Sequence, residues 1–203
     1  MPITKAYNGI KQSIIDNVNK IIKCKKQNID LKNNNFNKYI SKFCSSEGKN
    51  ISNIIDSSPF ANKIYSGPAY VVRDFTVNIN ANIVTLYSDK SGSGKYELLK
   101  FEEDDWYRKQ YIKYYLENLT EEQLEEINDK YNGDLLKKVL KIEIPDYDKS
   151  QVVGRVVNEW EDLQKEIEEL EVKIEKTDNE INQRVYDLYD LTEKEIKIVE
   201  ESL

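Results

Sequence analysis

Four consecutive acidic residues, Glu102-Glu103-Asp104-Asp105, form the densest group of side chains able to support chemistry in this sequence. Carboxylates are the oxygen ligands that divalent cations prefer, so an enzyme with a metal site in this run is one hypothesis. The same run is typical of a helix N-terminus, where acids face the positive end of the helix dipole. We favour the helix start and expect neither a metal nor another cofactor to bind this chain.

Other catalytic arrangements find little support in the sequence. The chain contains no histidine, which excludes Ser-His-Asp and Cys-His catalysis and histidine-ligated metals. The segment Ser91-Gly92-Ser93-Gly94-Lys95 is followed by Tyr96, whereas a phosphate loop needs Ser or Thr there and glycines farther apart. Pro145-Asp146 lacks the second strand with Glu-x-Lys that PD-(D/E)xK nucleases require. We therefore expect no catalytic residues and predict that the chain alone is not an enzyme.

The longest regular pattern lies in the last third of the chain, where apolar residues alternate at steps of three and four. Thr177 occupies one slot of this stripe, which otherwise consists of Val156, Trp160, Leu163, Ile167, Leu170, Ile174, Ile181, Val185 and Leu188. This spacing is typical of a coiled-coil seam, and a single helix cannot bury it. We therefore expect a helix from about Lys149 to Asp190 that pairs with another helix, in this chain or in a second one.

Shorter patterns predict other helices. Residues 9–27 form an amphipathic pattern whose predicted buried face holds Ile10, Ile14, Val18, Ile21 and Ile22. The Asn33–Asn35 run interrupts it, residues 36–43 predict a short helix, and residues 44–58 read as a loop. A helix should follow Asp104 and reach Leu116. Capping boxes at Thr120 and Thr192 predict two more helices, ending at Gly133 and near Glu201, and residues 134–142 predict a short helix or turn.

Residues 69–101 change to a period of two. Val71, Phe75, Val77 and Ile79 are followed by Val84 and Leu86 and then by Leu98 and Leu99, with turn residues between the groups. This pattern predicts a three-stranded antiparallel meander, with residues 91–94 as a hairpin turn. The predicted fold is thus α+β and mostly helical, with a long coiled-coil-like helix pair. We divide it into an N-terminal helical arm (1–45), a small α+β module (46–148) and a long heptad helix with a capping helix (149–203).

The charges are distributed unevenly along the chain, whose formal net charge is −7. Residues 1–50 contain 10 lysines and 3 acids, whereas residues 151–203 contain 7 basic and 16 acidic residues. An acidic total argues against binding a polyanion over the whole surface, but the basic N-terminal quarter could contact one. Simple solvation of a lysine-rich helix is the alternative interpretation.

Cysteine content and hydropathy indicate the compartment. Cys24 and Cys44 fit neither a disulfide framework nor a zinc site, which indicates reduced thiols. No apolar run approaches the roughly 20 residues of a membrane span, and the N-terminus lacks the apolar region of a signal peptide. We therefore expect a soluble, cytoplasmic protein without a membrane partner.

The C-terminal segment carries a more specific signal. Residues 174–200, IEKTDNEINQRVYDLYDLTEKEIKIVE, closely resemble the C-terminal end of type IIG restriction–modification enzymes and related N6-adenine DNA methyltransferases. The pattern of that family is similar to I-x-x-T-D-x-x-I-D-x-x-V-Y-x-L-Y-G-L-T-x-x-E-I-x-x-V-E. Asn182 and Asp190 replace its usual Asp and Gly. Pro2-Ile3 and the helix from Ile10 to Lys26 look like the strand and helix that close the target recognition region of such enzymes.

The resemblance implies a role for the chain. The methyltransferase domain, which would bind S-adenosylmethionine, is absent, so the chain looks like a C-terminal piece or a stand-alone version of such an enzyme. In this family paired helices fix the DNA-reading module relative to the catalytic domain. The resemblance therefore implies that the heptad helix packs antiparallel against the helix at 10–26 and acts as a spacer. The expected partners are DNA and a methyltransferase or endonuclease domain or subunit.

Two functional hypotheses follow. The first is a non-catalytic DNA-specificity or structural module of a restriction–modification methyltransferase. Phosphate contacts would then come from the basic quarter, and Asn in the 33–35 run could pair with adenine; the expected DNA-binding residues are Lys20, Lys23, Lys25, Lys26, Lys32, Asn34, Lys38 and Lys42. The second is a helical protein–protein interaction adaptor that docks or oligomerises through the heptad seam, with a homodimer as one such assembly, without contacting DNA.

Overall fold

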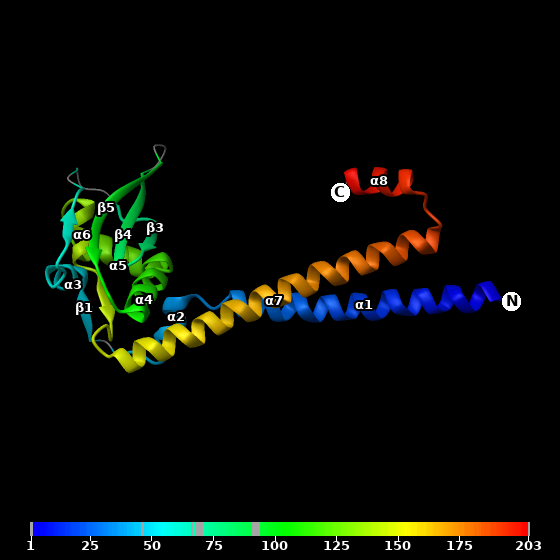
Figure 1. Cartoon of the computed structure of the whole chain (residues 1–203), viewed down its shortest axis with the longest axis horizontal. Helices are drawn as coiled ribbons and strands as arrows, with labels where there is room; N and C mark the ends of the chain where they lie inside the picture. Colours follow the sequence, from blue (N-terminus) through cyan, green and yellow to red (C-terminus); the bar gives the residue numbers. More distant parts are fainter. Residues whose placement is uncertain (1, 46, 66, 68–70, 91–93, 203) are drawn as a thin grey trace. The chain divides into compact units, whose positions relative to one another are not determined.

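The computed structural model describes residues 2–45, 47–65, 67, 71–90 and 94–202 (Figure 1). They form two compact units. The helical unit consists of Met1–Asn33 and Asp162–Leu203, and the α+β unit consists of Asn34–Glu161. This division groups the two ends of the chain together, whereas the sequence suggested three consecutive segments. The fold class is the predicted one, α+β and mostly helical, with two long helices and small antiparallel sheets.

The α+β unit contains a four-stranded antiparallel sheet with the strand order β2-β5-β4-β3. Its strands are β2 (Ala61–Lys63), β3 (Phe75–Asn80), β4 (Ile83–Lys90) and β5 (Gly94–Glu102). The meander β3-β4-β5 confirms the predicted hairpins, since Lys90 pairs with Gly94; the predicted turn residues 91–93 lie outside the described residues. The sequence missed β2, because this three-residue edge strand is exposed throughout and shows no apolar alternation.

One face of this sheet is buried against α4 (Trp106–Glu117). Side chains from three strands contribute to it, including Val77, Val84, Leu86, Leu99 and Phe101. The helix begins where the acidic run predicted, because the Asp105 side chain accepts a hydrogen bond from the Arg108 N–H and so caps it. On the helix, Tyr111 and Ile112 are fully buried.

The predicted loop at 44–58 is wrong. This segment contains β1 (Gly48–Asn50) and α3 (Ile51–Asp56), and β1 pairs with β6 (Glu143–Pro145) in a two-stranded sheet. Ile51, Ile54 and Ile55 are buried, at helical spacing, but only six residues carry the pattern and polar residues surround it. A segment this short gives too little periodicity to be recognised from the sequence.

The remaining helices of the α+β unit follow the predicted capping signals. Asn35 caps α2 (Phe36–Ile40), which confirms the break at residues 33–35. Thr120 and Gln123 form the predicted capping box of α5 (Glu121–Lys130). This helix ends at Lys130, before the predicted Gly133, which has a φ of +128°. The short helix α6 (Leu135–Leu140) then leads into β6.

The helical unit is built from α1 (Pro2–Lys32) and the part of α7 (Ser150–Tyr189) beyond Asp162. Figure 1 shows α1 and α7 side by side with opposite chain directions, which confirms the expected helix pair. Because α1 begins at Pro2 and continues to Lys32, the strand expected at Pro2-Ile3 is wrong, and the helix is longer than the predicted 9–27. The chain ends with α8 (Glu193–Glu201), which begins at the predicted capping box of Thr192.

The inner face of α1 is a second heptad seam. Its buried and half-buried residues follow one another at alternating steps of four and three: Ile10, Ile14, Asn17, Ile21, Cys24, Asn28 and Leu31. Val18 and Ile22, which the sequence placed on the buried face, are 37% and 59% exposed, so this part of the prediction is wrong. The error arose because polar Asn17 and Asn28 and the small Cys24 occupy seam positions, while apolar residues form a neighbouring stripe.

Candidate functional site

The residues of the predicted seam on α7 are buried or half-buried, and they divide between the two units. Its first two residues, Val156 and Trp160, belong to the α+β unit. There the Trp160 ring lies 5.2 Å from the Phe36 ring and 6.1 Å from the Tyr39 ring, measured between centroids. From residue 163 onward the seam belongs to the helical unit, with Ile167 and Leu170 buried and Leu163, Ile174, Ile181, Val185 and Leu188 half-buried. One stripe therefore anchors α7 in both units.

Polar residues interrupt the seam of the helical unit. Thr177, in the slot noted from the sequence, is buried and its Oγ1 donates a 2.7 Å hydrogen bond to the Lys173 carbonyl of its own helix. On α1, Asn28 is buried, and Asn17 Nδ2 is shielded from solvent without a hydrogen-bond partner among the described residues. In coiled coils such residues reduce stability but fix register and orientation. This helix pair therefore has features that favour one alignment.

Two exposed polar contacts join the helices at the edges of the seam. Gln27 Nε2 donates a 2.9 Å hydrogen bond to Glu166 Oε1, and Lys32 Nζ lies 2.5 Å from Glu171 Oε1. Both side chains of the ion pair are about half exposed, so the pair contributes little stability. The apolar seam holds the helices together.

The structure divides the eight expected DNA-binding residues between the two units. Lys20, Lys23, Lys25, Lys26 and Lys32 lie on α1 in the helical unit, and Asn34, Lys38 and Lys42 lie in the α+β unit. All seven lysines are exposed, whereas Asn34 is half-buried. The exposed ammonium groups of these lysines are accessible for phosphate contacts.

The five lysines of α1 differ in their surroundings. Lys25 and Lys32 line a hollow of about 370 Å³ between α1 and α7, together with Asn28, Ile29, Glu171, Ile174, Glu175 and Asp178. The carboxylates in this hollow compete with phosphate for the two lysines. Lys20, Lys23 and Lys26 follow one another at steps of three, outside that hollow, and are therefore better suited to contact a phosphate backbone.

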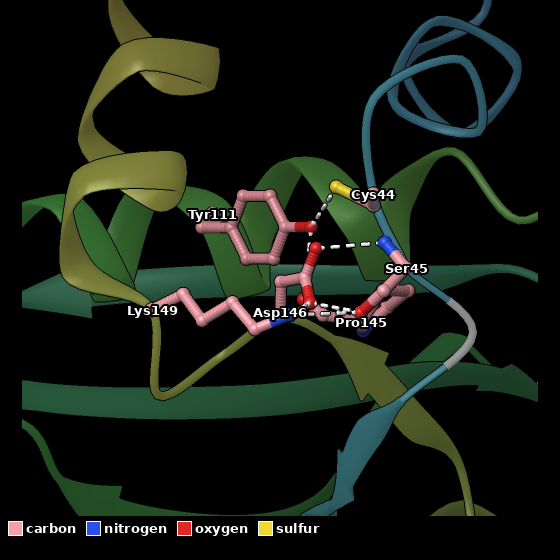
Figure 2. Close-up of polar contacts among 6 residues, drawn as sticks. All are labelled: Cys44, Ser45, Tyr111, Pro145, Asp146 and Lys149. Atoms are coloured by element: carbon pink, nitrogen blue, oxygen red, sulfur yellow. Dashed lines mark hydrogen bonds and ion pairs between the residues drawn. The ribbon is translucent and has the colours of Figure 1, made fainter.

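A polar network that the sequence did not indicate is centred on Asp146 (Figure 2). The Asp146 carboxylate is almost fully buried and accepts hydrogen bonds from the Ser45 N–H at 2.8 Å, from Ser45 Oγ, and from Lys149 Nζ at 2.6 Å. Beside it, Tyr111 OH donates a 3.0 Å hydrogen bond to the Pro145 carbonyl and contacts Cys44 Sγ at 3.5 Å. The network joins the segment after α2 to the turn before α7.

The contacts in this network shift the pKa values of its titratable groups. Burial alone would raise the pKa of Asp146, but the hydrogen bonds from Lys149 and Ser45 outweigh it and lower that pKa to about 2. The same bond to Asp146 raises the pKa of Lys149, so this amine keeps its proton and cannot act as a base toward Ser45. Burial raises the pKa of the Cys44 thiol, which disfavours the reactive thiolate.

Three carboxylates of the acidic run 102–105 make hydrogen bonds within the α+β unit. Glu103 Oε2 accepts a hydrogen bond from Tyr147 OH, and its Oε1 accepts one from the Asp105 N–H at 2.9 Å. Glu102 accepts a hydrogen bond from Asn82, and Asp105 caps α4. Among the described residues, no group of three or more Asp, Glu, Cys or His side chains is arranged to hold a metal ion.

Comparisons of the chain with protein-family models, curated proteins and solved structures find no match. Among the described helices, none has both the length and the apolar content needed to cross a bilayer.

Proposed function

We propose that this chain is a non-catalytic DNA-specificity or structural module of a restriction–modification methyltransferase or endonuclease, in which the paired helices act as a spacer. The single observation that carries the proposal is the chain order. The chain forms α1, then the α+β unit, and then returns along α1 as α7. Such an arrangement suits a reader module carried on a helical support that joins it to a catalytic domain elsewhere.

The geometry of the C-terminal segment supports the resemblance. Asp190 stands where the resembling enzymes usually have Gly, and its φ is +50°, in the left-handed region that Gly adopts most readily. The Leu191 N–H donates a 3.0 Å hydrogen bond to the Tyr186 carbonyl, as in a Schellman cap. Tyr186 is buried, and Thr192 and Glu195 form a capping box. Each of these pattern positions therefore has a structural reason in this chain.

Salt-dependent binding to duplex DNA tests the proposal. A protein that neutralises Z phosphates shows a slope of about −0.9Z in log K against log salt concentration. The Lys20→Ala, Lys23→Ala, Lys26→Ala variant should weaken binding uniformly across sequences and make the slope shallower by up to about 2.7. The matched control removes three exposed lysines of α7, in Lys165→Ala, Lys173→Ala, Lys176→Ala, and should leave the slope unchanged. Absence of duplex binding by the wild-type chain at low salt would reject the proposal.

The heptad seam itself is already covered by α1 and α2. One observation nevertheless favours the adaptor alternative, through a different surface of α1. Ile15, Val18 and Ile22 form an exposed apolar stripe on α1, and Lys26 lies beside them at helical spacing. In the same unit, α8 has no buried residue and carries four glutamates against two lysines. The complementary charges single out α8 of a second copy as the occupant of the stripe.

Sedimentation separates the two functions. A spacer with a closed intramolecular helix pair sediments as a monomer. A homodimer that dissociates on Ile22→Lys, while Lys23→Ala leaves it intact, would favour the adaptor. A monomer at all concentrations would exclude the homodimer, and a dimer that persists in Ile22→Lys would exclude this stripe as its interface.

A further inference from the structure

The four-stranded sheet has an open face opposite the one that α4 buries. Along β3, buried Phe75 and Val77 alternate with exposed Asn78 and Asn80, so the two asparagines point to the open side. A hollow of about 490 Å³ lies on this face, and its lining includes Asn78, Asn80, Ile83, Thr85, Tyr87 and Lys100. Amide, hydroxyl, ammonium and apolar groups thus converge on one surface of the α+β unit.

The strand register arranges these side chains in rows. Asn78 pairs with Thr85, and Thr85 pairs with Lys100 across β3, β4 and β5. Asn80 pairs with Ile83 in the next row. Residues paired directly across strands place their side chains on the same face of the sheet. The first row therefore places the exposed amide of Asn78 and the half-buried ammonium of Lys100 on either side of Thr85, which is only 7% exposed.

These groups match the edges of base pairs. Asn can form two hydrogen bonds to adenine, Lys donates to guanine, and an apolar side chain such as that of Ile83 can contact the thymine methyl. Residues two apart on a strand are separated by roughly 6.8 Å, which is two base-pair steps of about 3.4 Å. Three strands span about 10 Å, which is within the width of the major groove, about 12 Å.

An ion pair with Glu97 positions the Lys100 side chain on this face. Its Nζ lies 2.8 Å from Glu97 Oε2, and this hydrogen bond raises the pKa of Lys100. The pairing keeps the ammonium protonated and restricts its position, while Glu97 neutralises its charge. A neutralised pair attracts phosphate weakly, so this face differs in chemistry from the lysine row of α1.

We infer that this open face reads base edges of an adenine-containing duplex, with Asn78 and Asn80 as the adenine-binding residues. The inference rests on the proposed function and assigns sequence recognition to a surface that the sequence did not indicate. Phosphate contacts elsewhere would supply affinity, while these two side chains would supply sequence preference.

Selection from a randomised pool of 30-base-pair duplexes tests the inference. The wild-type chain should enrich a motif that contains adenine. The Asn78→Ala, Asn80→Ala variant should lose at least about tenfold of that enrichment, while its affinity for the unselected pool stays within about twofold. The matched control, Asn53→Ala, Asn132→Ala, removes two exposed asparagines outside the hollow and should enrich the same motif as the wild type. A thermal melt verifies that both variants are folded.

The outcomes separate this inference from the proposed function. If the wild-type chain binds no duplex at low salt, both fail. If it binds the pool but enriches nothing, or if the Asn78→Ala, Asn80→Ala variant enriches the wild-type motif, the readout by this face fails and the DNA-binding function stands. An enriched motif without adenine would also overturn the inference. Loss of the motif in a folded variant, with pool affinity retained, supports it.

Discussion

The Asp146 carboxylate accepts a 2.8 Å hydrogen bond from the backbone N–H of Ser45, 101 residues earlier in the chain. Asp146 has a φ of +51°, a conformation that costs energy for a residue with a side chain but is tolerated by Asp and Asn. The turn before α7 is therefore held by a long-range polar contact. Its function in the fold is to connect the segment after α2 with the start of α7.

Asp146→Asn should destabilise the α+β unit by about 1–3 kcal/mol. The amide tolerates the positive φ and keeps the size of the side chain, but it cannot accept at both positions or pair with the Lys149 ammonium. Both tryptophans, Trp106 and Trp160, belong to the α+β unit, so urea unfolding followed by tryptophan fluorescence reports on this unit. Lys165→Ala, at an exposed position of the helical unit, is the control and should leave the fluorescence transition unchanged. An unchanged midpoint for Asp146→Asn would contradict the structural role of the network.

The stability of the α+β unit should depend on pH through the same carboxylate. Its folded pKa of about 2 lies below the ordinary value of 3.8, so the charged form stabilises the folded state above about pH 4. This stabilisation, roughly 2 kcal/mol, should disappear as the pH falls from about 4 through about 2. The difference in unfolding free energy between the wild type and Asp146→Asn should therefore shrink over this window. A constant difference from pH 5 to pH 2 would exclude the assignment.

Leu170→Ala should destabilise the helical unit by about 2–3 kcal/mol, because Leu170 is buried in the seam. Val172, two residues later, is 65% exposed, and Val172→Ala should change the stability by less than about 0.7 kcal/mol. Thermal unfolding followed by circular dichroism at 222 nm monitors the helices of both variants. Equal effects of the two substitutions would show that the seam is not the buried surface of α7.

Asn17→Leu should stabilise the helical unit by about 1–2 kcal/mol, because it removes a shielded amide nitrogen that has no partner among the described residues. It should also weaken the preference for one alignment, visible as additional oligomers in sedimentation. The matched control is Asn19→Leu, at an exposed position of the same helix, which should give no such gain. A loss of stability in Asn17→Leu would mean that the amide is satisfied in solution.

The sequence was informative where the evidence is local. The heptad of α7 and the capping boxes of Thr120 and Thr192 depend on residues within one or two turns, and these elements begin and end close to the predicted positions. Periodicity could not indicate which of two neighbouring stripes on α1 is buried, because Asn17 and Asn28 in the seam weaken the apolar signal.

The candidate sites depend on contacts between residues far apart in the chain, so the sequence predicted little of their arrangement. Nothing near Asp146 in the sequence identifies Ser45 as its partner. The row of Asn78, Thr85 and Lys100 depends on the register of three strands, which no local pattern in the sequence specifies. The lysines were found by composition alone, and composition could not indicate that Lys32 pairs with Glu171.

Asp190→Gly should stabilise the end of α7 by about 0.5–1 kcal/mol. Asp190 adopts a φ of +50° immediately after the last helical residue, and Gly occupies this conformation without the steric cost of a Cβ atom. Gly loses more chain entropy on folding, which reduces the gain but does not reverse it at a left-handed position. Lys176→Gly is the control, at an exposed position inside α7. It should destabilise the helix by about 1 kcal/mol, because Gly there has the same entropy cost without the relief of a left-handed conformation. Thermal unfolding at 222 nm should therefore shift in opposite directions for the two variants, and a loss of stability in both would mean that Asp190 does not hold a left-handed cap in solution.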